Sequence, residues 1–84
     1  MKNTVTISDL KNALHALNVA KGFETSPYKG NTNKSNIGNF HLSRAYGGFN
    51  VHQIANEAGG VTEPSGGGHV TKRECLERIN RLFY

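Results

Sequence analysis

A glycine-rich segment that leads into a helix start is the part of this sequence best suited to bind a ligand. Residues 65–73 read Ser-Gly-Gly-Gly-His-Val-Thr-Lys-Arg. Gly66, Gly67 and Gly68 carry no side chain that could obstruct a ligand, and free N–H groups in the first turn of a helix attract anions. The pattern therefore predicts an anion-binding site in which Thr71 and its neighbours donate backbone N–H groups.

Positive side chains are placed where they could complete this site. Lys72 and Arg73 fall in the first helical turn, where cations are unfavourable for the helix itself, and a bound anion would offset that conflict. His69 lies shortly before them, and Arg44 could neutralise further charge. The simpler interpretation is a flexible linker followed by an ordinary capped helix. A Walker loop is excluded, because the Gly-Lys-Thr/Ser ending is absent.

A second set of residues supports an alternative function, the binding of nucleic acid. Lys29 and Lys34 lie near Tyr28 in a polar segment. With the cations named above, these lysines could contact phosphates with little sequence readout, and Tyr28 could stack on a base. The simpler interpretation of this segment is a solvated loop.

The sequence contains no pattern typical of catalysis or of a metal site. Its four histidines are His15, His41, His52 and His69, and none has the spacing of a zinc motif. Cys75 is the single cysteine, which excludes an intrachain disulfide and favours a buried core position. No nucleophile has an adjacent base. We therefore expect a non-enzymatic protein without a cofactor.

Two amphipathic helices are predicted, one over residues 7–20 and one after Thr71. In each, apolar residues recur at spacings of three and four, which places them on one face. Thr6 with Asp9, and Thr71 with Glu74, form capping-box patterns at the two helix starts.

Between the helices, alternating apolar residues predict a β-hairpin over residues 40–54. A turn at Gly47-Gly48 would join its strands, because glycine accepts the positive φ that tight hairpin turns require. This register sets His41 opposite residue 54 and not opposite His52. For residues 49–54 a helix is the alternative interpretation.

The remaining segments complete an α+β fold in a single domain of residues 1–84. Residues 60–63 could form a third short strand. Residues 23–39 are rich in Asn, Ser, Thr and Gly and predict a long flexible loop. The expected architecture is an N-terminal helix, a long loop, a small antiparallel sheet or hairpin, and a C-terminal helix, with both helices packed on one face of the sheet.

Composition limits the function further. The chain has 84 residues and a formal net charge of +4, which favours anionic partners. The basic excess lies in residues 21–44 and 71–84. No membrane span and no secretory signal are expected, so the protein should work in the compartment where it is made. A core this small also leaves room for stabilisation by homodimer formation.

Residues 40–84 resemble a group of small proteins encoded by tailed bacteriophages. The resemblance rests on Ala-Tyr-Gly-Gly-Phe at 45–49, Asn-Glu-Ala-Gly-Gly-Val at 56–61 and Gly-His-Val-Thr-Lys-Arg-Glu at 68–74. Members of that group mostly have no assigned function, so the likeness transfers no active-site residues. It implies a viral origin and a location in the cytoplasm of the host cell.

These observations converge on one leading expectation and two alternatives. The leading expectation is a phage accessory protein that counters a host process or host defence by stoichiometric binding of a host protein complex or a phosphorylated, nucleotide-like ligand. The alternatives are a sequence-nonspecific nucleic-acid-binding protein and a homodimeric protein-interaction module.

Overall fold

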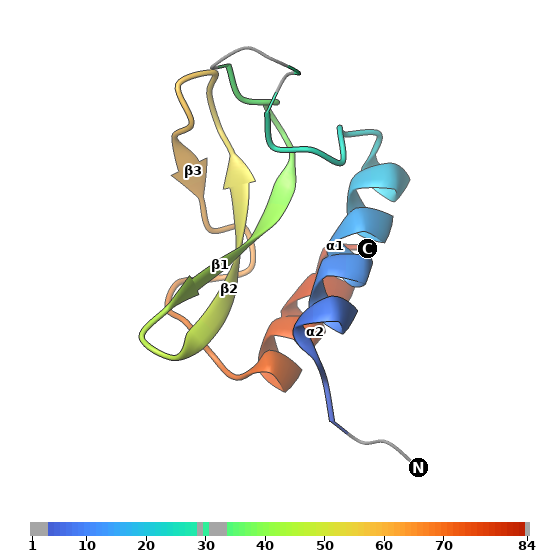
Figure 1. Ribbon diagram of the computed structural model, residues 1–84, viewed down its shortest axis with the longest axis vertical. Coiled ribbons are helices and arrows are strands. Elements are labelled where there is room, and N and C mark those ends of the chain that lie inside the picture. The colour runs from blue at the N-terminus through green and yellow to red at the C-terminus, as the bar shows by residue number, and fades with distance from the viewer. Residues whose placement is uncertain (1–3, 29, 31–33, 84) are drawn as a thin grey trace.

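The protein folds as a helix, a three-stranded antiparallel sheet and a second helix (Figure 1). The computed structural model describes residues 4–28, 30 and 34–83. In chain order its elements are α1 (Ile7–Lys21), β1 (Phe40–Ala45), β2 (Gly48–Ile54), β3 (Val61–Thr62) and α2 (Lys72–Leu82). The sheet order is β1-β2-β3. The predicted α+β fold is confirmed.

Both helices begin where the sequence predicts. The Thr6 side chain accepts the Asp9 N–H at 3.1 Å, and the Asp9 carboxylate accepts the Thr6 N–H at 2.8 Å, so the capping box of α1 is complete. At α2 the Thr71 hydroxyl accepts the Glu74 N–H at 3.2 Å. Each cap satisfies a backbone group that the first helical turn would otherwise leave without a partner.

The core lies between the two helices and one face of the sheet (Figure 1). α1 packs on β1, α2 packs on β2, and the helices contact each other. The fully buried side chains of the core include Leu10, Leu17, Val51, Cys75 and Ile79. Burial raises the pKa of the Cys75 thiol, as expected for a cysteine that serves as a small apolar residue.

The hairpin turn differs from the prediction, and the difference changes the strand register. Tyr46 and Gly47 have φ values of 54° and 75°, so they form the turn, and Gly48 already belongs to β2. Ala45 pairs with Gly48, and His41 pairs directly with His52. The prediction that a hairpin keeps these two histidines apart is therefore wrong.

The physical reason for this register lies in a distant residue. A Cβ atom added at Gly48 would lie 2.9 Å from Cβ of His69, so the second glycine makes room for His69 against the strand. The turn moves one residue toward the N-terminus, and Tyr46 takes the positive φ, which is uncommon for a residue other than glycine.

Buried asparagines fix the described part of residues 23–39. Asn36 Nδ2 donates to the Ser26 carbonyl at 2.9 Å, and Asn39 Nδ2 donates to the Glu24 carbonyl at 2.7 Å. Asn39 is fully buried. The flexibility of the segment stays a prediction. Its polar side chains include asparagines that hydrogen-bond to backbone carbonyls of the same segment.

Candidate anion-binding site

The start of α2 is held against the hairpin by two backbone hydrogen bonds. The N–H of Phe49 donates to the Val70 carbonyl, and the N–H of Val70 donates to the Phe49 carbonyl, each at 2.8 Å. This pairing brings the first turn of α2 next to the hairpin turn. A surface hollow lies at the junction, and the described residues that line it are Thr4, Val5, Gly47, Phe49, Thr71, Lys72 and Arg73.

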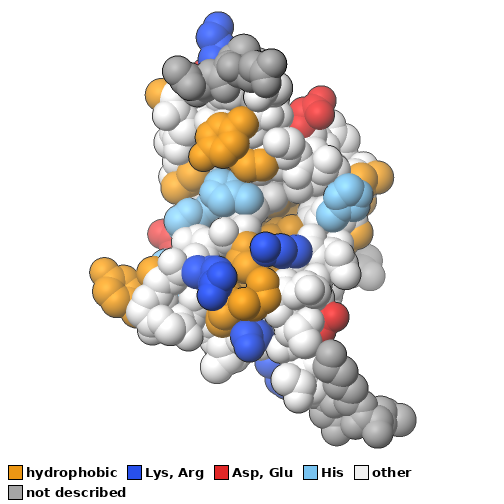
Figure 2. Space-filling view, in the orientation of Figure 1, with side chains coloured by type: hydrophobic (Ala, Val, Ile, Leu, Met, Phe, Trp, Pro, Cys, Tyr) orange, Lys and Arg blue, Asp and Glu red, His pale blue; other side chains and the backbone are white. Residues whose placement is uncertain are grey.

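Two cations share the ring of Phe49. Arg44 Cζ lies 5.7 Å from the ring centroid, and Lys72 Nζ lies 5.8 Å from it. Arg44 pairs with Phe49 across the hairpin, so their side chains stand on the same face of the sheet. We call these three residues the Phe49 cluster. Figure 2 shows basic side chains gathered around an apolar patch on this side of the molecule.

The Phe49 cluster concentrates positive charge. No Asp or Glu of residues 4–28, 30 and 34–83 forms an ion pair with Arg44 or Lys72. The positive end of the α2 dipole lies beside them and adds to the same potential. The electron-rich ring attracts each cation, but it carries no net charge and neutralises neither. The arrangement can therefore accept a phosphate or a carboxylate.

The glycine loop has a different partner from the one that the sequence predicts. The Arg78 guanidinium donates to the carbonyls of Gly66, Gly67 and Gly68 at 3.3, 3.3 and 3.1 Å. The loop thus presents carbonyl oxygens to a cation of its own chain. None of the three glycines lines the hollow at the α2 start.

Asn50 joins this loop to the sheet. Its side chain is fully buried, accepts from Arg78 Nη1 at 2.9 Å, and donates to Glu63 at 2.8 Å and to the Gly66 carbonyl at 3.1 Å. Glu74 lies four residues before Arg78, a spacing that favours a pair on the surface of one helix, and no sequence pattern had singled out Asn50. A polar residue between the apolar Phe49 and Val51 was the available signal, since a buried amide requires partners.

The predicted site residues therefore lie in three places, of which the glycine loop beside Arg78 is the first. Arg44, Thr71, Lys72 and Arg73 lie at or beside the hollow at the start of α2. His69 lies over the sheet instead, where its Nε2 is 2.9 Å from the Ser43 hydroxyl oxygen. Its ring centroid is 6.3 Å from that of His52.

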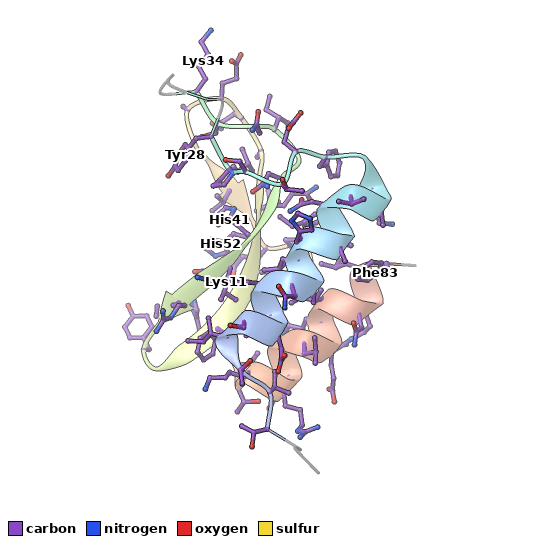
Figure 3. All side chains as sticks on the ribbon, turned by 45° about the vertical axis from the view of Figure 1, so that its right-hand side comes forward. Lys11, Tyr28, Lys34, His41, His52 and Phe83 are labelled. Carbon is purple, nitrogen blue, oxygen red and sulfur yellow. The ribbon has the colours of Figure 1, made fainter. Side chains whose placement is uncertain are left out.

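Two further histidines meet across the hairpin. The His41 and His52 ring centroids are 5.8 Å apart, and Figure 3 labels both on the strands. Burial, together with the nearby His52, lowers the pKa of His41 below its ordinary value of 6.5. Within the described chain, no group of three or more His, Cys, Asp or Glu residues is arranged to hold a metal ion.

The residues of the nucleic-acid alternative lie elsewhere. Tyr28 and Lys34 are at the end of the molecule opposite the hairpin turn (Figure 3). Lys34 Nζ is 3.8 Å from a carboxylate oxygen of Glu57. Lys29 lies outside the described residues. The structure does not bring Tyr28 or Lys34 together with the Phe49 cluster.

Comparisons of the chain with protein-family models, with curated proteins and with solved structures found no match. The resemblance to bacteriophage proteins therefore stays a hypothesis. In the described residues, neither α1 nor α2 is long and apolar enough to cross a membrane.

Proposed function

We propose that this chain is a non-enzymatic binding protein that holds a negatively charged group of its partner at the Phe49 cluster. The observation that carries the proposal is the placement of Arg44 and Lys72 over one ring, without a carboxylate of the described chain to neutralise either. Each of these cations can make a charge-assisted contact with an anion that approaches the Phe49 ring from its side. The open hollow at the α2 start gives such an anion access.

The cluster favours recognition of charge over recognition of a base. Phe49 is only 8% exposed, and its ring packs in the core while the cations lie over it. A nucleobase would need an open ring face to stack. The ligand group is therefore a carboxylate or a phosphate, carried by a host protein or by a phosphorylated small ligand.

The biological role that fits is that of a bacteriophage accessory protein inside the host cell. The segment that resembles phage proteins, residues 40–84, contains the whole Phe49 cluster. A stoichiometric binder needs a complementary surface and no catalytic group. Binding of an acidic host component would then block a host process or a host defence.

Charge reversal at the cluster tests the proposal. The variant Arg44→Glu with Lys72→Glu should bind ATP or a glutamate heptapeptide roughly tenfold or more weakly than the wild type, because charge-assisted contacts are lost. The matched control, Lys21→Glu with Lys34→Glu, changes the net charge equally at other places. Isothermal titration calorimetry at two salt concentrations measures both.

Two results would overturn the proposal. One is wild-type affinity in the Arg44 and Lys72 variant, and the other is equal weakening in the control, which would show a nonspecific charge effect. A short single-stranded DNA provides a third probe. DNA binding that falls steeply with salt and that the Lys34 control abolishes would favour the nucleic-acid alternative instead.

A further inference from the structure

The outer edge of β1 is capped by a side chain at a single residue. Phe40 N–H donates to Asn18 Oδ1 at 2.8 Å, and Asn18 Nδ2 donates to the Phe40 carbonyl at 2.9 Å. Asn18 is 1% exposed and comes from α1. Its amide thus makes the two bonds that the next strand of a sheet would make.

The same edge continues without a cap. Backbone N–H and C=O groups of alternate residues point to the same side of a strand, so those of Leu42 and Arg44 point outward as Phe40's do. β2 occupies the opposite side through the groups of His41 and Ser43. In the part of the chain that the structure describes, nothing bonds the outward groups of Leu42 or Arg44.

A groove runs beside this edge, between β1 and α1. Its lining includes the apolar Leu14 and Leu42 and the cation Lys11. Figure 3 shows Lys11 on α1. Arg44 lies one residue before the end of β1. The edge therefore combines three features: backbone groups available for hydrogen bonds, apolar side chains, and a cation beside the groove and near the end of β1. A second polypeptide strand that lay along β1 would contact all three.

We propose that an extended acidic segment of a partner protein adds to β1 as a further strand, bonding Leu42 and Arg44 through its backbone. Its carboxylates contact Lys11 and the Phe49 cluster, so this inference rests on the proposed function and names its partner. Strand addition supplies affinity through main-chain bonds, while side chains supply specificity.

The charge around the edge selects this occupant over two others. A second copy of the chain would bring its own Arg44 and Lys11 to the same interface, and like charges on an edge strand oppose self-pairing. A nucleic acid could neutralise the cations, but it has no regular row of amide donors and acceptors to match the strand. An acidic peptide satisfies both the charge and the edge.

A pair of peptides tests strand addition directly. The probe is an octapeptide of alternating Glu and Val with blocked ends, and its control carries a methyl group on every backbone nitrogen. Both have the same charge, but the control cannot donate to the strand. We expect the control to bind roughly tenfold or more weakly, because at least two net hydrogen bonds are lost. In NMR, saturation with the probe should slow hydrogen exchange of the Leu42 and Arg44 amides.

The outcomes separate this inference from the proposed function. Equal affinity of both peptides, with no added protection of Leu42 and Arg44, would overturn strand addition and leave charge recognition standing. Binding of neither peptide would overturn strand addition here, and the ATP titration then decides the proposed function separately. Protection of both amides in the protein alone, with a dimeric mass in sedimentation, would show that a second copy occupies the edge and would also overturn the inference.

Discussion

The two outer edges of the β1–β2 hairpin differ in how much of their backbone is hydrogen-bonded. On the β2 side, Val70 pairs with Phe49, β3 pairs with the other end of the strand, and the Asn50 side chain accepts the Val51 N–H at 2.8 Å between them. On the β1 side, among residues 4–28, 30 and 34–83, only the Asn18 amide bonds the outer backbone edge of the strand, at Phe40.

The difference separates residues that stabilise the fold from residues for which we propose a role in binding. The covered edge uses the glycine loop, Glu63 and Arg78 to satisfy buried polar groups, so those residues serve the fold. The open edge keeps its donors and acceptors, and the Phe49 cluster lies at its end. An exposed strand edge can pair with other chains and aggregate, and natural proteins reduce this risk by placing charged side chains on it. Arg44 is such a charged side chain on β1.

Removing the centre of the covered edge should have the strongest effect on stability. Asn50→Ala deletes a fully buried amide and leaves Arg78 and Glu63 without that partner. We expect the free energy of unfolding to fall by about 2–4 kcal/mol. Urea denaturation followed by circular dichroism measures it. The matched control is Asn12→Ala on the exposed face of α1, and an equal loss in both variants would contradict the central role of Asn50.

Removing the cap of the open edge should cost less, because fewer groups lose their partners. Asn18→Leu keeps the side-chain volume but leaves the Phe40 N–H and C=O without their bonds. We expect a loss of about 1–3 kcal/mol and faster hydrogen exchange at Phe40. Unchanged exchange at the Phe40 amide would show that the Asn18 amide does not act as a strand cap.

The smallest effect is expected from pH, through the histidine on the open strand. Because the pKa of folded His41 is lowered, the unfolded chain binds a proton at higher pH than the folded chain does. The free energy of unfolding therefore has its full value above pH 6.5, the ordinary pKa of histidine. It decreases as the pH falls through the lowered pKa of His41. Thermal unfolding at pH 7.5 and pH 5 should show a smaller loss in His41→Gln than in the wild type. His15→Gln, on the exposed face of α1, is the control, and equal pH dependence in all three proteins would refute the assignment.

Patterns within a few residues predicted the elements well. The Thr6 and Thr71 caps bond N–H groups three residues away, so the sequence alone located both helix starts. Alternation of apolar residues located the hairpin strands, because side chains in a strand alternate between faces. The sequence also grouped Arg44 with Lys72, and both cations lie over the Phe49 ring, while their role in binding stays a prediction.

The same local patterns did not predict contacts between segments that are distant in the chain. The glycine loop looked like an anion cradle, but Arg78 reaches it from α2 and bonds its carbonyls. The sequence offered Arg78 an equally plausible partner, Glu74, one turn away. Only packing of α2 against β2 decides between a partner on the same helix and one across the core.

The sequence by itself therefore determined where both helices begin and favoured the two hairpin strands, since caps and periodicity act over one helical turn or one strand repeat. Only the tertiary structure excluded the alternative helix for residues 49–54, because they belong to β2. The tertiary structure decided the register of the hairpin, because Gly48 must leave room for His69. It also decided which edge of the sheet is covered, because that depends on where the chain after β2 returns. Pairing of residues far apart in the chain follows from the packing of whole elements, and no local pattern of residue types encodes it.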